Sequence, residues 1–224
     1  MRVIAFGAIL LTLFVIGRTV AQDDPIKRSP AVAIPTSWVL YEKQNEGFRI
    51  ALPPSWREII MDPMTRETAI KTMKENSRQA AAIAKNIDNN RLLSESGFYA
   101  SDTAPDVTIG SGSPSKINVI KVHLGERVSL DYFIQVNVRK MENNPGIEEP
   151  VLHRLVILPA GVAAEIRFRM RTDYSGQTWT ESFIQYAFIR GKDVYLVTLG
   201  TDGKNAERFT PIFDKIANSF HFTE

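Results

Sequence analysis

The sequence predicts an α+β fold, an α/β/α sandwich with a central, mainly antiparallel sheet. Most of the expected strands are short apolar runs that follow one another across brief turns containing Gly or Pro, which is the pattern of β-hairpins. Amphipathic helical patterns lie between groups of these strands. Of the 224 residues, 44% are hydrophobic and 9% are aromatic, which is enough for a packed core. Hairpins give antiparallel pairs and leave the helices to cover the sheet, so we do not expect a doubly wound nucleotide-binding fold.

The N-terminus has the features of a secretory signal peptide. Arg2 precedes an apolar run over residues 3–16, and residues 19–21 are small enough for a cleavage site. The run has 14 residues and is followed by Arg18, whereas a helix needs about 20 apolar residues to span a bilayer. We therefore expect residues 1–21 to be removed and the protein to be exported, periplasmic or extracellular, with no transmembrane span after cleavage. An uncleaved anchor is the alternative.

Loss of the signal changes the charge balance. The whole chain has 27 Lys and Arg against 25 Asp and Glu, and the signal holds two of the arginines and no acid. The mature chain is therefore neutral, and its overall charge favours neither nucleic acid nor an anionic membrane. The absence of cysteine excludes disulfides, thiolate metal ligands, a cysteine nucleophile and a lipid-modified cysteine. Residues 22–37 contain three prolines and are expected to be a flexible leader before a domain at 38–224.

The first half of this domain combines an early hairpin with a long helix. Residues 38–41 and 48–52 are expected to be strands, and Pro53 ends the second because proline cannot donate to a β-ladder. An acidic N-cap, Asp62, followed by proline predicts a helix over residues 62–89. Further along, we expect a short strand at 98–100, a loop rich in glycine and serine at 108–115, and a strand at 117–124.

The second half contains two helices and two further hairpins. Ser129 is the expected N-cap of a helix whose apolar face consists of Leu130, Phe133, Ile134, Val138 and Met141. Four strands then form two hairpins, 155–158 with 162–170 and 179–190 with 194–199. The regular part of a final helix is expected to begin at Thr210 with Pro211 in its first turn, and residues 220–222 close the domain as an edge strand.

Both ends of the domain resemble the PsbP-like family. At the start, a Gly-Phe strand runs into proline and then tryptophan: Gly47, Phe48, Pro53, Pro54 and Trp56. At the end, a closing helix leads into a Ser-Phe pair: Phe213, Ile216, Ser219 and Phe220. The resemblance implies an α/β/α sandwich and a protein that acts by binding a partner rather than by catalysis. No site motif of the family falls on identifiable residues here, so no functional residue is carried over.

The sequence has no recognisable motif for catalysis, a metal or a cofactor. His123, His153 and His221 have no second ligand at a metal-binding spacing, and no G-x-S-x-G nucleophile elbow occurs. Residues 200–203 lie between a strand and a helix but lack the lysine of a phosphate-binding loop, so we interpret them as a turn with Asp202 or Asn205 as helix cap. Two acidic pairs are interpreted as solvated surface, with a weak divalent-cation site as the alternative: Asp102 with Asp106, and Glu148 with Glu149.

The candidate functional residues are three arginines that alternate along one expected strand: Arg167, Arg169 and Arg171. Because side chains alternate across a sheet, the apolar residues between them face the opposite side. One interpretation is an ordinary strand whose arginines pair with neighbours such as Glu165 or Glu181. The other is a patch for an anion or an acidic partner, since guanidinium groups form bidentate pairs with carboxylate or phosphate.

These observations favour an exported, non-enzymatic binding or accessory protein of the cell envelope, whose partner is another envelope protein. A carrier that holds a small apolar ligand or lipid between sheet and helices is the alternative. A hydrolase with an unrecognised site is a third hypothesis, which would require a Ser/His/acid cluster in a cleft. No cofactor, metal or nucleic-acid partner is expected.

Overall fold

The computed structural model describes residues 27–28, 32–59, 97–104, 114–174 and 177–223. The expected signal peptide at 1–21, the expected helix at 62–89 and most of the expected loop at 108–115 lie outside these ranges. Of the expected leader at 22–37, only residues 27–28 and 32–37 are described.

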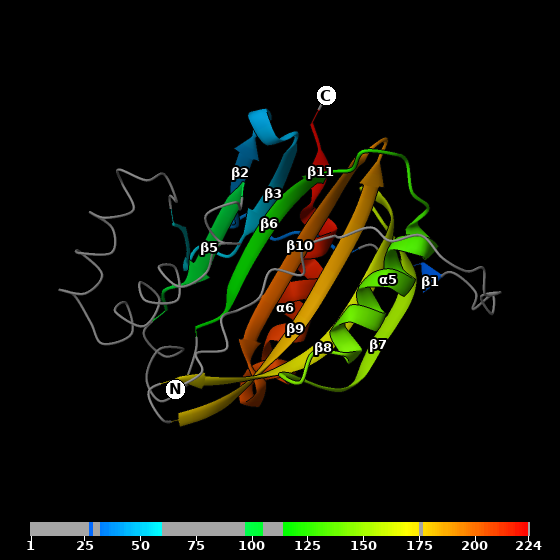
Figure 1. The fold of residues 1–224 in the computed structure, drawn as a ribbon. Coiled ribbons are helices and arrows are strands. Elements are labelled where there is room, and N and C mark those ends of the chain that lie inside the picture. The colour runs from blue at the N-terminus through cyan, green and yellow to red at the C-terminus, as the bar shows by residue number, and fades with distance from the viewer. Residues whose placement is uncertain (1–26, 29–31, 60–96, 105–113, 175–176, 224) are drawn as a thin grey trace, which may run out of the picture.

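Eight strands form the main sheet, in the order β1-β7-β8-β9-β10-β6-β5-β4 (Figure 1). Five long strands form its centre and run antiparallel to one another: β6 (Lys116–His123), β7 (Ile147–Leu158), β8 (Gly161–Tyr174), β9 (Gln177–Arg190) and β10 (Asp193–Asp202). At one edge, β5 (Phe98–Asp102) and β4 (Trp56–Glu58) continue the antiparallel pairing. At the other edge, β1 (Lys27–Arg28) pairs with β7 in parallel. The sheet is therefore mainly antiparallel, as predicted.

A second, three-stranded sheet contains the strands predicted at 38–41, 48–52 and 220–222. Its order is β11-β3-β2, with bounds of His221–Phe222 for β11, Phe48–Leu52 for β3 and Val39–Lys43 for β2. The 3-10 turn η1 (Gln44–Glu46) joins β2 to β3 and ends at Gly47, whose φ of 79° lies in the left-handed region. A Cβ at that position would lie 3.0 Å from the Tyr195 hydroxyl, so both conformation and space favour glycine.

In the described part of the chain, two helices cover opposite faces of the main sheet, which confirms the α/β/α sandwich (Figure 1). Helix α5 (Leu130–Glu142) begins at its predicted cap, where the Ser129 hydroxyl accepts from the Tyr132 amide at 3.2 Å, and it buries the predicted apolar face. Helix α6 (Ala206–Ser219) packs against β3, β9 and β10 on the other face. Within the described residues, no helix has the length and apolar character needed to cross a membrane.

The predicted start of the last helix was wrong. Helix α6 begins at Ala206, and Pro211 lies inside it rather than in its first turn. The 3-10 turn η2 (Gly203–Asn205) precedes it, and the Asp202 carboxylate caps that turn by accepting from the Lys204 amide at 2.9 Å. Phe209 is fully buried in the first turn of α6, and the burial of this ring outweighs the hydrogen bond that an exposed proline removes.

Several strands exceed their predicted bounds. The strand predicted at 155–158 begins at Ile147, and its register against β8 breaks between Glu148 and Leu152. Pro150 lies within this break, and a proline in a sheet is tolerated at such an irregularity because no ladder hydrogen bond is required of it there. The short strand β4 directly follows the prolines that end β3 and was not predicted.

The residues that carry the family resemblance contact one another. Phe220 stacks on Phe48 with ring centroids 5.5 Å apart, and Trp56 meets Phe213 edge to face at 6.4 Å. The Ser219 hydroxyl accepts from the Ala51 amide at 2.9 Å and so joins the end of α6 to β3. The two ends of the domain therefore form one part of its core, which gives these motifs a structural role.

Candidate functional site: an arginine surface on strand β8

The three arginines of β8 lie on the same face of the sheet as α6. Ile166, Phe168 and Met170 alternate with them and pack into the apolar cluster beneath α5, as the period of a strand requires. Helix α6 packs against β9 and β10, and on its side of the sheet β8 is buried at Ala163 and Glu165. The exposed fraction of the side chain accordingly rises along the strand, from 34% at Arg167 to 59% at Arg169 and 62% at Arg171.

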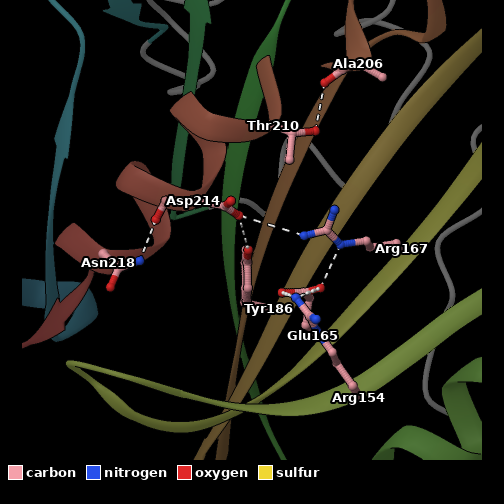
Figure 2. A network of polar contacts seen from close by, with 8 residues as sticks. All are labelled: Arg154, Glu165, Arg167, Tyr186, Ala206, Thr210, Asp214 and Asn218. Atoms are coloured by element: carbon pink, nitrogen blue, oxygen red, sulfur yellow. Dashed lines mark hydrogen bonds and ion pairs between the residues drawn. The ribbon is translucent and has the colours of Figure 1, made fainter. Parts of the chain in front are cut away.

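Arg167 belongs to a polar network between the sheet and α6 (Figure 2). Its Nε donates to Glu165 Oε1 at 2.7 Å, and its Nη2 lies 3.8 Å from Asp214 Oδ1. Arg154 on β7 also pairs with the buried Glu165, at 2.9 Å. The Tyr186 hydroxyl donates to Asp214 Oδ1 at 3.3 Å. Two guanidinium groups thus compensate one buried carboxylate, and Arg167 has a structural role here.

The environment of Asp214 makes it sensitive to pH. Burial raises the pKa of Asp214 above its ordinary value, and the charge of Glu165 acts in the same direction, while Arg167 and the Tyr186 hydrogen bond oppose them. Burial likewise raises the pKa of Tyr186, so its hydroxyl stays protonated and available as a donor. Since the folded state holds the Asp214 proton more tightly than the unfolded state, Asp214 stabilises the fold at low pH, and this contribution is lost as the pH rises through the folded pKa.

We expect the free energy of unfolding of Asp214→Asn, relative to that of the wild type, to be higher at about pH 7 than at about pH 3. The reason is that asparagine does not titrate and keeps an acceptor for Tyr186. Urea unfolding at a series of pH values measures this difference. Asp193→Asn is the matched control, because hydrogen bonding from His123 lowers the pKa of Asp193, with Lys121 adding to the effect. That variant should show the opposite trend. If the stabilities of the two variants, relative to the wild type, change with pH in the same direction, the opposite pKa shifts of Asp214 and Asp193 are contradicted.

Arg169 and Arg171 share a single carboxylate. Arg169 Nε lies 3.6 Å from Glu148 Oε2, and Arg171 Nη2 lies 3.6 Å from Glu148 Oε1. Both distances exceed those of hydrogen bonds between nitrogen and oxygen, which are about 2.7–3.2 Å. The carboxylate instead accepts from the Thr180 hydroxyl at 3.2 Å. Within the described residues the two guanidinium groups therefore keep donors for an external anion.

Of the two expected acidic partners, only Glu165 lies on the arginine face. Glu181 was the wrong choice: in the register it is opposite Met170, on the face of the sheet that carries α5. It pairs instead with Lys116 at 2.7 Å. Sequence reasoning assigned no role to Arg154, Glu148 or Asp214 around the arginines. Pairing across the hairpin could have indicated the first two, whereas Asp214 approaches only through the packing of α6.

The three histidines singled out in the sequence lie on strands other than β8. No group of three or more metal-ligating side chains occurs within the described part of the chain. His123 Nδ1 lies 2.7 Å from Asp193 at the surface, and burial lowers the pKa of His221. Residues 200–203 end β10 and begin η2, as the turn interpretation predicted. Asp202 caps η2 through its side chain, whereas Asn205 is the N-cap residue of α6 but makes no capping hydrogen bond with its side chain.

Comparison with known proteins identifies the fold. No family model matches the chain, and no curated protein matches it. Among solved structures, it matches the Ran-binding protein Mog1p of Saccharomyces cerevisiae with a TM-score of 0.50 and 9% identity, over 86% of this chain and 97% of that one. Cyanobacterial PsbP (CyanoP) of Synechocystis sp. PCC 6803 matches with a TM-score of 0.45 and 13% identity, over 87% and 96% of the two chains. LpqN of Mycobacterium tuberculosis, involved in cell envelope biogenesis, matches with a TM-score of 0.45 and 13% identity, over 79% and 83%. The match to Mog1p shows the PsbP/Mog1-like fold that the ends of the sequence implied.

Proposed function

We propose that this chain is an exported, non-enzymatic binding or accessory protein of the cell envelope, and that Arg169 and Arg171 contact an acidic region of its partner. The observation that carries this proposal is the exposure of the Arg169 and Arg171 side chains, 59% and 62%, which share one carboxylate at 3.6 Å. Exposed arginines form bidentate pairs with carboxylates, and arginine is enriched among residues that dominate protein interfaces. Mog1p, which shares the fold, is itself a Ran-binding protein.

The fully compensated Arg167 has a different part in this proposal. Its Nε pairs with the buried Glu165 of the same strand at 2.7 Å, and its Nη2 faces Asp214 of α6 at 3.8 Å. The strand that presents Arg169 and Arg171 is fixed by its pairing with β7 on one side and β9 on the other. A rigid strand lowers the entropy that a partner must overcome on binding, because the interacting side chains start from a fixed backbone. The three arginines therefore divide into one that pairs with a buried carboxylate within the fold and two that contact the partner.

A carrier for a small apolar ligand would need a hollow with an apolar lining. One hollow among the described residues is lined by polar side chains and one glycine: Glu42, Lys43, Gln44, Asn45, Glu46 and Gly97. Sites for apolar ligands are lined mainly by hydrophobic and aromatic side chains, so this hollow has the wrong chemistry.

The binding proposal is tested by photo-crosslinking in cells. Leu152 is exposed, faces the same side as the arginines and lies opposite Arg167, so a photoreactive amino acid placed there should capture the partner. We expect a discrete crosslinked product that disappears in the double variant Arg169→Glu, Arg171→Glu. The matched control reverses two exposed arginines near and on α5, Arg127→Glu with Arg139→Glu, and should keep the product. Equal crosslinking in both double variants would refute the proposed surface.

Export is tested on the same material. If residues 1–21 are a cleaved signal, mass spectrometry of the exported protein should give Gln22 as its first residue. An exported protein that still begins at Met1 would show that the apolar segment is retained.

A further inference from the structure

Glu148 occupies the space between the two exposed arginines in the free protein. Its carboxylate faces Arg169 with one oxygen and Arg171 with the other, each at 3.6 Å. Glu148 is the register partner of Arg169, and Arg171 is two residues further along β8. A carboxylate placed symmetrically between two guanidinium groups, yet too far for a hydrogen bond with either, is a weak internal ligand.

The backbone around Glu148 provides a way for this carboxylate to leave. The pairing of β7 with β8 is interrupted directly after Glu148 and resumes at Leu152. Residues in such a break are not held by a continuous ladder, so a small backbone or side-chain shift there disturbs few hydrogen bonds. The remaining hydrogen bond of the carboxylate comes from the Thr180 hydroxyl, which can instead donate to water.

The spacing of the arginines indicates the shape of the group that would replace Glu148. Alternate residues of a strand lie on one face about 6.8 Å apart, so Arg169 and Arg171 repeat at that interval. An extended peptide repeats its own alternate side chains at the same interval. Each guanidinium can therefore receive one carboxylate of a partner segment that runs along β8. The exposed Leu152, on the same face, adds an apolar contact beside the arginines.

We propose that Arg169 and Arg171 bind an extended acidic segment of a partner protein, with carboxylates at alternate positions, and that this segment displaces Glu148 from between the two guanidinium groups. This inference rests on the proposed function and specifies the partner's chemistry. Glu148 then determines specificity. A partner that offers a single carboxylate does not displace Glu148, whereas a partner with two correctly spaced carboxylates gains two bidentate pairs in exchange for the two long contacts of Glu148.

Fluorescence anisotropy with labelled peptides tests this inference. The probe is an eight-residue peptide of four glutamates that alternate with serines. The matched control peptide, Glu-Ser-Ser-Glu-Glu-Ser-Ser-Glu, has the same composition but no two glutamates at alternate positions. We expect the alternating peptide to bind the wild type more tightly than the control peptide. Glu148→Gln should bind the alternating peptide about threefold to fivefold more tightly than the wild type, since it removes a competing ion pair of ordinary surface strength. Gln can still accept from Thr180, which preserves the local structure.

Further variants separate charge from geometry. Arg169→Glu with Arg171→Glu should abolish binding of the peptide. Arg169→Lys with Arg171→Lys keeps the charge but loses the planar guanidinium, and it should bind more weakly than the wild type. Urea unfolding of each variant establishes that it is folded, so a loss of binding can be attributed to the surface.

The outcomes distinguish this inference from the proposed function. Equal affinity of the wild type and Glu148→Gln for the alternating peptide would overturn the displacement of Glu148. Equal affinity for the two peptides, or binding of inorganic phosphate in place of either, would overturn the extended acidic segment as the ligand. In each case, loss of the crosslink at Leu152 in the charge-reversal variant would still support the arginine surface. If charge reversal leaves that crosslink unchanged, the proposed function itself fails.

Discussion

Replacing Phe220 by alanine is expected to destabilise the fold by about 3–5 kcal/mol, the range for removing a large aromatic ring from a packed core. Phe220 is fully buried directly after α6. Its ring stacks between Phe48, at 5.5 Å, and Phe188, at 5.1 Å between centroids. The substitution therefore leaves a cavity where the small sheet, α6 and the main sheet meet. Urea unfolding followed by fluorescence or circular dichroism measures the loss.

Phe222→Ala is the matched control for this prediction. Phe222 contacts the same aromatic cluster, through Phe188 and Tyr195, but it is only half-buried in the short edge strand β11. The alanine variant should lose clearly less stability than Phe220→Ala because less apolar surface becomes exposed and the site opens to water. Equal destabilisation of the two variants would contradict this prediction, because it would show that the full burial of Phe220 does not account for its contribution to stability.

The double variant Arg154→Met, Arg167→Met is expected to lose about 3–5 kcal/mol, because it leaves a buried carboxylate without a counter-ion. The Glu165 side chain is only 4% exposed, and these two guanidinium groups are the ion-pair partners that the described structure gives it. The methionines keep the long unbranched stem, so packing changes little. Equilibrium urea unfolding at neutral pH and low salt measures the effect.

Adding Glu165→Met to the double variant should restore most of the lost stability. The three charged groups are then replaced together by apolar ones, an exchange that is often neutral or stabilising when the side chains pack well. The single variant Glu165→Met should cost less than the arginine double variant, since Arg154 is 45% exposed and Arg167 34% exposed and both can turn to water. A triple variant that stays as unstable as the double variant would show that packing, not the unpaired carboxylate, causes the loss.

The sequence alone predicted the elements whose signals are local. The alternation of apolar residues along β8, the N-cap at Ser129 and the hairpin turns are properties of a few neighbouring residues, and the structure shows each where it was expected. The errors occurred where a distant contact overrides a local signal. Pro211 indicates a helix start, but the burial of Phe209 extends α6 back to Ala206. The hairpin of β2 and β3 becomes a separate three-stranded sheet by pairing with β11, which lies at the far end of the chain.

For the candidate site, too, local periodicity predicted one part and tertiary packing decided the other. Side chains alternate between the two faces of any strand, so every second residue lies on the same face. This period places three arginines on one face of β8: Arg167, Arg169 and Arg171. The packing of α6 and the register of β7 decide which of these arginines is neutralised. They bring Asp214 and Arg154 to the network of Arg167. They leave Glu148 at 3.6 Å from each of the other two arginines.

The sequence by itself therefore determined that this protein is an α+β sandwich with three arginines in line on one strand. The tertiary structure decided that one of these arginines pairs with a buried carboxylate and that two are exposed to solvent. The physical reason is that backbone periodicity places side chains on a face, while burial and ion pairing depend on which distant elements pack over that face.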